Sequence, residues 1–195
     1  KDQVHFVYSH YDRYITGGAM PVTEKIKLET IPELLKEPFF LSRRELGIIN
    51  VGGDGTVEVD GTIFEIHTKE ALYIGKGAQS VYFSSKDPLK PAKFYLNSTP
   101  AHRTCPTKKV TKADANKIEL GAAETANHRT INQMLLHTVI ETCQLQMGMT
   151  ELKPGSVWNT MPAHTHTRRM EAYFYFNVPE GNAICHLMGE PKQQR

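Results

Sequence analysis

The chain has 195 residues, of which 23 are basic and 21 are acidic, so its formal net charge is +2. This length can bury a substantial core in one large domain or in two small ones. The charges are scattered, and no basic run is long enough to follow a phosphate backbone, which excludes nucleic acid as the expected partner. No apolar run approaches the ~20 residues that a membrane helix needs, and no signal-peptide layout is present, so we expect a soluble protein with no membrane partner.

The cysteines indicate the compartment. There are three, too few and too widely spaced for a disulfide framework, and none belongs to a C-x-x-C pair. The expected location is therefore the reducing cytoplasm. Both ends of the chain look cut, because it begins without Met, with strand-like residues from Val4, and stops at Arg195 soon after another strand-like run. We expect a fragment of a longer protein.

Strand signals dominate the first hundred residues, where short β-branched and aromatic runs alternate with glycine turns. One helical turn is expected at Ile31–Lys36, with Pro32 in its first turn and Pro38 after its end. Hairpin turns are expected at 52–54 and 60–61. The expected strands cover residues 4–8, 47–51, 55–59, 62–66, 71–74 and 80–83.

Between residues 101 and 128 the strand pattern fades into Thr-, Lys- and Ala-rich sequence, which we interpret as a linker or arm. Strand signals then resume in the last third of the chain. The expected strands there cover residues 141–147, 156–160, 172–176 and 183–187.

An internal echo relates the two halves, since Gly18–Thr23 resembles Asn159–His164. Repeated similarity of this kind is typical of duplicated domains. The sequence therefore predicts an all-β protein with two tandem β-barrels. The first barrel would occupy residues 1–100, and residues 129–195 would form the first part of the second.

The most informative motif has two histidines and a glutamate in H-x-H-x4-E spacing, between two expected strands. In an extended strand alternate side chains share a face, so His164 and His166 point the same way, ~6.6 Å apart along the backbone. Four residues then turn the chain so that Glu171 returns beside them. Two imidazoles and a carboxylate suit one divalent ion. The sequence predicts an open metal site at these three residues; the alternative is that the histidines are solvated loop residues.

The strand expected after this motif has two faces. Because side chains alternate along a strand, Tyr173 and Tyr175 should point into the barrel interior with Glu171, while the even-numbered aromatic residues face an apolar layer. The next hairpin places His186 opposite Tyr175, and Tyr175 lies ~13 Å along the strand from Glu171. We therefore interpret His186 as an interior histidine and not as a ligand.

The motif and its strand setting resemble the first metal-binding motif of the cupins. Other strings, along nearly the whole chain, resemble those of the 5-keto-4-deoxyuronate isomerase family, and they are far more specific than H-x-H alone. The resemblance implies a bicupin, with two jelly-roll barrels of which the second is incomplete here. The strings are Tyr8-Ser9-His10-Tyr11-Asp12-Arg13, Arg43-Arg44-Glu45-Leu46-Gly47, Tyr73-Ile74-Gly75-Lys76-Gly77-Ala78, Pro106-Thr107-Lys108-Lys109-Val110, Arg129-Thr130-Ile131-Asn132 and Asn159-Thr160-Met161-Pro162-Ala163-His164-Thr165-His166.

The family resemblance implies that only the C-terminal barrel binds zinc, through three histidines and one glutamate. The three predicted ligands match three of these, and the fourth, a histidine of a later strand, lies beyond the end of this chain. In the first half, Ser80 stands where a second cupin motif carries histidine, and Val22 and Thr23 replace the histidine pair. We expect a metal-free first barrel that serves packing and subunit assembly.

The resemblance also implies the reaction, which interconverts 5-dehydro-4-deoxy-D-glucuronate and 3-deoxy-D-glycero-2,5-hexodiulosonate in pectin and uronate degradation. This is an aldose–ketose isomerisation, in which zinc would act as a Lewis acid on the C1 and C2 oxygens. Because the substrate is an anion, Arg168 and Arg169 are candidates to bind its carboxylate, with simple surface charge as the alternative. Tyr173, Tyr175 and Gln144 are candidate cavity residues. The sequence assigns no proton-transfer base, and a hydride shift would need none.

Two other functions stay open. Two histidines and a carboxylate also suit the iron of a non-haem cupin dioxygenase. A bicupin could instead bind a sugar acid without turnover. The resemblance favours the isomerase, as a homohexamer with one zinc ion per subunit and a deoxy-keto-uronate as its small-molecule partner.

Overall fold

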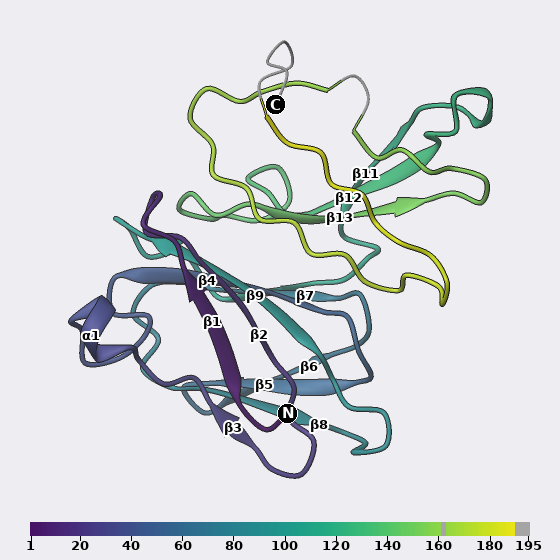
Figure 1. Cartoon of the computed structure of the whole chain (residues 1–195). Coiled ribbons are helices and arrows are strands. Elements are labelled where there is room, and N and C mark those ends of the chain that lie inside the picture. The colour runs from purple at the N-terminus through teal and green to yellow at the C-terminus, as the bar shows by residue number, and fades with distance from the viewer. Residues whose placement is uncertain (161–162, 190–195) are drawn as a thin grey trace.

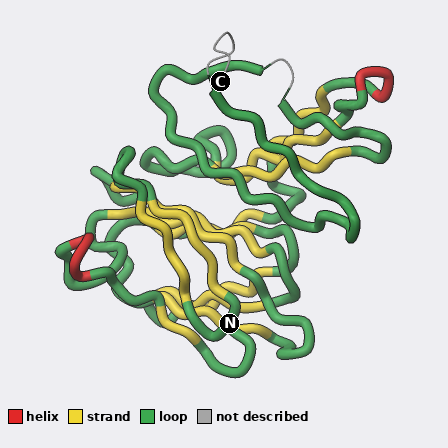
Figure 2. The backbone as a smooth tube through the Cα atoms, viewed as in Figure 1, coloured by secondary structure: helices red, strands yellow, loops and turns green. Residues whose placement is uncertain are grey.

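The computed structural model describes residues 1–160 and 163–189. Its regular structure is almost entirely β-strand, and long loops connect the strands (Figure 2). Its two helices are a single turn each, so the prediction of an all-β protein is confirmed. In the described ranges no helix is long and apolar enough to cross a bilayer. The elements are β1 (Val4–Tyr8), β2 (Ile15–Ala19), β3 (Ile26–Lys27), α1 (Pro32–Leu35), β4 (Arg44–Asn50), β5 (Gly55–Val59), β6 (Thr62–Ile66), β7 (Ala71–Ile74), β8 (Val81–Ser85), β9 (Phe94–Pro100), β10 (Lys108–Val110), β11 (Asn116–Leu120), the 3₁₀ helix η1 (Ala123–Thr125), β12 (Arg129–Leu135) and β13 (Met147–Leu152).

Strands β1–β10 form two antiparallel sheets, which we call the first unit (Figure 1). The larger sheet has six strands in the order β1-β2-β9-β4-β7-β10, and the smaller has four in the order β3-β8-β5-β6. The predicted hairpin between β5 and β6 is present, with Val59 opposite Thr62. Asp60 and Gly61 both have positive φ there, 47° and 85°, as a two-residue hairpin turn requires. Two facing sheets joined in this way agree with the predicted jelly-roll architecture.

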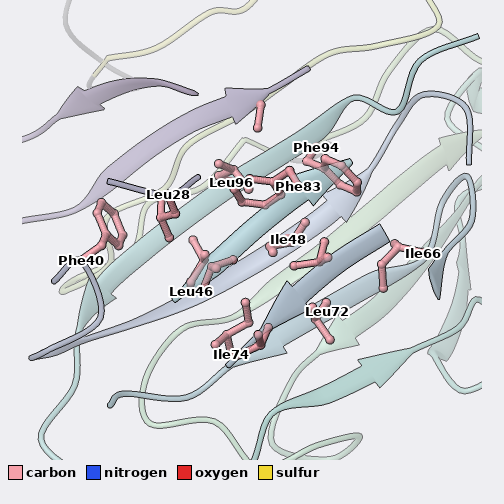
Figure 3. Packing of buried hydrophobic residues seen from close by; sticks show 14 of the residues in the cluster. Leu28, Phe40, Leu46, Ile48, Ile66, Leu72, Ile74, Phe83, Phe94 and Leu96 are labelled. Carbon is pink, nitrogen blue, oxygen red and sulfur yellow. The ribbon is translucent and has the colours of Figure 1, made fainter. Parts of the chain in front are cut away.

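The core of the first unit lies between these two sheets (Figure 3). Side chains alternate across a strand, so Leu46 and Ile48 of β4 point into this core with Phe83 of β8 and Phe94 of β9. All four are fully or almost fully buried. Removing each such side chain from water contributes about 1.5–3 kcal/mol to folding, and this core therefore gives the six-stranded sheet a rigid base.

The other face of the six-stranded sheet is also buried. Ile49 of β4 and Tyr73 of β7 pack there against Leu135 and Met147, in a second apolar cluster. A Cβ atom on Gly47 would lie 2.3 Å from the sulfur of Met147 and 2.8 Å from Cδ1 of Leu135. The two parts therefore approach each other closely at Gly47, and a side chain here would require the flexible ends of Met147 and Leu135 to move. Strand β4 contributes to two cores, one on each face.

The C-terminal part of the chain, from β11 onward, lies against that second face (Figure 1). Strands β11, β12 and β13 form a separate antiparallel sheet. The segment 101–128, predicted to be a linker or arm, contains both β10 and β11. The two strands were missed because they form by pairing with distant strands and have no clear pattern of their own. β10 pairs with the edge of β7, and β11 pairs with the edge of β12.

Four strands predicted in the C-terminal part are wrong. The strand expected at 141–147 begins only at Met147, as β13, and the segments 156–160, 172–176 and 183–187 contain no strand. Their alternating apolar pattern suits a strand, but a strand forms only when a neighbour accepts its backbone hydrogen bonds. No described segment pairs with these, and Tyr173 and Phe174 are about half exposed, at 50% and 51%. The part of the chain predicted to begin a second barrel, residues 129–195, contains β12 and β13, and its other described residues form no strand.

Candidate functional site

An open cleft of about 1320 Å³ lies between the outer face of the six-stranded sheet and the C-terminal part. Its floor includes Tyr95, Asn97 and Thr99 of β9, and β12 and β13 form part of its wall. Pockets that take small ligands commonly have a volume of about 300–1,000 Å³, so a sugar acid fits with room for water. All eight residues predicted from the sequence line this cleft: Gln144, His164, His166, Arg168, Arg169, Glu171, Tyr173 and Tyr175.

The three predicted metal ligands are neighbours in the cleft. The rings of His164 and His166 meet edge to face with their centroids 4.9 Å apart. Glu171 returns beside them, and its Oε1 lies 3.4 Å from Nε2 of His166. The predicted turn between the second histidine and the glutamate thus brings these side chains together, although the segment that carries Glu171 is not a strand.

The chemistry of these donors fits zinc, which takes imidazole nitrogen and carboxylate oxygen as ligands. Their arrangement is looser than a closed coordination shell: among residues 1–160 and 163–189, no three His, Cys, Asp or Glu side chains converge closely enough to hold an ion. All three side chains also face solvent. Metal binding at these residues therefore stays a prediction.

Arginine charge lies directly beside the predicted ligands. Nη1 of Arg169 is 3.4 Å from Oε1 of Glu171 and 3.5 Å from a ring nitrogen of His166. Arg168 also lines the cleft. Two guanidinium groups in one cleft can attract an anionic ligand. Arg169 also competes with a metal for Glu171, so its position would change when an ion binds.

Tyr173 holds the other oxygen of Glu171, since its hydroxyl donates to Oε2 at 3.0 Å. Partial burial and this carboxylate both raise the pKa of Tyr173. The phenol therefore stays protonated at neutral pH and remains a hydrogen-bond donor. Burial also raises the pKa of Tyr175. The site thus offers two neutral phenols, one of which fixes the carboxylate of a predicted ligand.

Side chains alternate along residues 171–176, but the two sides are not a barrel interior and an apolar layer, because Tyr173 and Phe174 both line the cleft and are half exposed. Tyr173 and Tyr175 stack on one side, whereas Phe174 stacks on Tyr95 of β9 with ring centroids 4.9 Å apart. The hydroxyl of Tyr175 also forms a hydrogen bond with Nδ1 of His186, as the predicted hairpin requires. However, His186 is exposed, so its interpretation as an interior histidine is wrong. Its ring lies against those of Tyr173 and Tyr175 in a segment that forms no strand.

Two functional candidates were missed by the sequence analysis. Arg129 and Asn97 line the cleft and are more than nine-tenths buried. Within the described part of the chain, Nε of Arg129 and Oδ1 of Asn97 have no hydrogen-bond partner. Buried polar atoms usually have partners, so these two are unsatisfied polar atoms in the wall of the cleft. No pattern in the sequence indicates that these two residues line a cleft, because β9 and β12 face it only as a result of tertiary packing.

Comparison with known proteins identifies the family. The model of the KduI/IolB family matches residues 2–194. A protein of Formosa agariphila named 4-deoxy-L-threo-5-hexosulose-uronate ketol-isomerase is 61% identical over 194 residues, which cover all of this chain and 69% of that protein. A protein of the same name from Bacteroides fragilis is 62% identical with the same coverage.

A solved structure shares the fold. The iolb-like protein of Salmonella typhimurium LT2 superposes with a TM-score of 0.51 at 12% identity, over 66% of this chain and 47% of that one. At this identity the similarity concerns the fold alone. The family match over nearly the whole sequence and the two relatives above 60% identity lead to one conclusion: this chain belongs to the KduI/IolB family.

Proposed function

We propose that this protein is a 4-deoxy-L-threo-5-hexosulose-uronate ketol-isomerase, an enzyme of pectin and uronate degradation. The observation that carries the proposal is that one cleft gathers all eight predicted site residues, in a chain whose relatives bear that name. The cleft combines metal-binding donors with arginine charge, which suits a small anion that carries a carbonyl group.

His164, His166 and Glu171 would hold a divalent ion, for which zinc is our proposal. When bound, the ion would supply Lewis-acid stabilisation of negative charge on the substrate oxygens. The hydrogen bond from Tyr173 orients the carboxylate of Glu171. Such support of a ligand by a second residue is common at metal sites and fixes the direction of its lone pairs.

The substrate carboxylate needs a cation, and three arginines are available. Arg168 and Arg169 follow the histidines directly, whereas Arg129 reaches the cleft from β12. Arg129 differs from the other two, because it is only 8% exposed and its Nε lacks a hydrogen-bond partner among the described residues. A desolvated guanidinium binds a carboxylate more strongly than an exposed one does.

Gln144 and the two tyrosines complete the polar lining. The side-chain amide of Gln144 donates to Oγ1 of Thr99 at 3.3 Å, so it is held against the end of β9. Both phenols are neutral, but Tyr173 already donates its one proton to Glu171, so towards a substrate hydroxyl group it can only accept. The hydroxyl of Tyr175 shares its hydrogen bond with His186. No residue is assigned as the base, and both an enediol route and a hydride shift are compatible with this lining.

Three further features belong to the proposal. The substrate is a free deoxy-keto-uronate. The protein works in the cytoplasm, in agreement with its three free cysteines, Cys105, Cys143 and Cys185. The first unit carries no metal and takes part in assembly as a homohexamer, which light scattering of the full-length protein would test.

The proposal is tested by metal analysis and a ketol-isomerase assay on the full-length protein. We expect about one divalent ion per subunit, conversion of 4-deoxy-L-threo-5-hexosulose uronate, and loss of activity on chelation with recovery on adding zinc. Binding of the sugar acid without turnover by the metal-loaded protein would instead make it a binding protein. Oxygen uptake with bound iron would make it a dioxygenase.

A further inference from the structure

Glu45 of β4 is a fully buried carboxylate that accepts four hydrogen bonds from two different parts of the chain. The hydroxyl of Tyr73, on the neighbouring strand β7, donates to its Oε2 at 2.5 Å. The backbone N–H of Cys143 donates to the same oxygen at 2.8 Å. The N–H groups of Gln144 and Leu145 donate to Oε1 at 2.8 and 2.7 Å. Three consecutive backbone donors therefore converge on one side chain.

No cation accompanies this carboxylate, since none of the ion pairs among the described residues includes Glu45. Its charge is balanced by oriented dipoles, and hydrogen bonds to an ionised group are about twice as strong as those between neutral groups. Burial and the Glu45 carboxylate both raise the pKa of Tyr73, so the phenol remains a donor. The arrangement holds the backbone of residues 143–145 onto the outer face of the first unit.

The segment that Glu45 holds carries a cleft residue. Gln144, the middle of the three donors, lines the cleft. Its side chain also donates to Thr99 and to the carbonyl oxygen of Pro100, both at the end of β9. Glu45 itself does not touch the cleft. The backbone N–H groups of the residues on either side of Gln144 are also bonded to Glu45. The loop therefore cannot rotate to turn the Gln144 side chain away from the cleft.

We infer that Glu45 is a positioning residue of the active site, through which the first unit fixes the 143–145 loop and Gln144 at the edge of the cleft. The inference rests on the proposed isomerase function. The first unit then has a part in the chemistry beyond packing and assembly, because its strand β4 sets the geometry of a residue in the cleft. A loop misplaced by about 1 Å can lower a rate by about a hundredfold.

The test compares Glu45→Gln with Gln144→Ala and with the double variant, in full-length, zinc-loaded protein. Because the amide of glutamine has one accepting oxygen where the carboxylate has two, we expect kcat to fall by about tenfold to a hundredfold. KM should change by less than about threefold, since the charged groups that bind the substrate are untouched. The double variant should be no slower than the slower single variant, because both changes remove the same positioned group.

Glu151→Gln is the matched control. Glu151 of β13 also links the two parts, through Lys69 at 2.6 Å, but it does not line the cleft, so its kcat should equal that of the wild type. The inference would be overturned if the double variant lost as much kcat as the two single variants together, or if Glu45→Gln left kcat unchanged. If Glu45→Gln does not fold, Tyr73→Phe, which removes one of the four donors, gives the same test with a smaller loss.

Amide hydrogen exchange separates this inference from the proposed function. In Glu45→Gln, the amides of residues 143–145 should exchange at least about tenfold faster than in the wild type, because a hydrogen bond to a charged group contributes about 1.5–3 kcal/mol. Amides of β5 should be unaffected. If the wild type has no isomerase activity, the proposed function fails. If it is active and the 143–145 amides keep their protection in Glu45→Gln, the positioning role fails alone.

Discussion

The first unit and the C-terminal part of this chain are built in different ways. The first unit closes a dense apolar core between two sheets. The C-terminal part has one three-stranded sheet and a long irregular return segment, yet it carries all eight predicted site residues. The irregular segment contacts the first unit, for example where Phe174 stacks on Tyr95. Stability and chemistry are therefore concentrated in different regions, and the site depends on the surface that the first unit provides.

The largest effect on stability is expected in the core of the first unit. Phe83→Ala should lower the free energy of unfolding by about 3–5 kcal/mol, because the ring is fully buried against Phe94. Phe174→Ala is the matched change in the C-terminal part and should cost about 1 kcal/mol, the contribution of one stacked ring pair. Urea denaturation of both variants measures the difference. Equal losses would contradict the contrast between the two regions.

The largest effect on chemistry is expected at the predicted ligands. His166→Ala should abolish metal content and isomerase activity together, while the melting temperature of the metal-free protein changes little, because the side chain is exposed. His137→Ala, also exposed but outside the cleft, is the control. Elemental analysis, activity and thermal melting of the full-length variants provide the measurements. A metal-free variant that keeps full activity would refute the assignment.

Arg129 tests whether the sheet of the C-terminal part binds the substrate. Arg129→Gln should raise KM about tenfold or more, because a hydrogen bond to a charged group is lost. Arg43→Gln removes an equal charge at an exposed position paired with Glu37 and should leave KM unchanged. Steady-state kinetics at one ionic strength separates local binding from a general effect of charge. The same KM in both variants would exclude Arg129 as the carboxylate anchor.

The smallest effect concerns the ion pair that joins the two regions. Burial opposes ionisation of Glu151, but Lys112 and Lys69 lower its pKa from 4.5 to about 2. A lowered pKa stabilises the fold above pH 4.5, and this contribution is lost as the pH falls towards 2. Glu151→Gln should therefore cost about 1 kcal/mol or less at pH 7 and nothing near pH 2. Thermal melts from pH 7 to 2.5 should converge; a constant difference would show that the ion pair is not the cause.

Six strands of the first unit, β1 and β4–β8, were predictable because their signals are local, whereas β2, β3 and β9 were not expected from the sequence. The runs expected at 55–59, 62–66 and 71–74 are β5, β6 and β7 with the same bounds. Hydrophobic alternation and glycine turns determine such strands almost alone. The order of the strands was not predictable, since β9 lies between β2 and β4 only through pairing over a long sequence distance.

The candidate site shows the same division. The spacing of His164, His166 and Glu171 is local, and in the structure the ring of His166 lies next to both His164 and Glu171. Arg129 and Asn97 were missed because their exposure to the cleft depends on how two sheets pack. The strands expected at 172–176 and 183–187 were wrong for a related reason. Hydrophobic periodicity indicates which side chains share a face, but it does not show whether a neighbouring strand is present to pair with the segment.

Gly47 has a consequence for how the molecule is made. Its missing side chain allows the C-terminal part to approach β4 closely, with Met147 and Leu135 in the space that a Cβ atom would need. Domains generally fold from the N-terminal end during synthesis, so the ribosome delivers the strands of the first unit before β12 and β13. The later segments then condense on a surface that is already finished. A side chain at this position would not prevent the first unit from forming, but Met147 and Leu135 would have to shift before the nascent C-terminal part could dock.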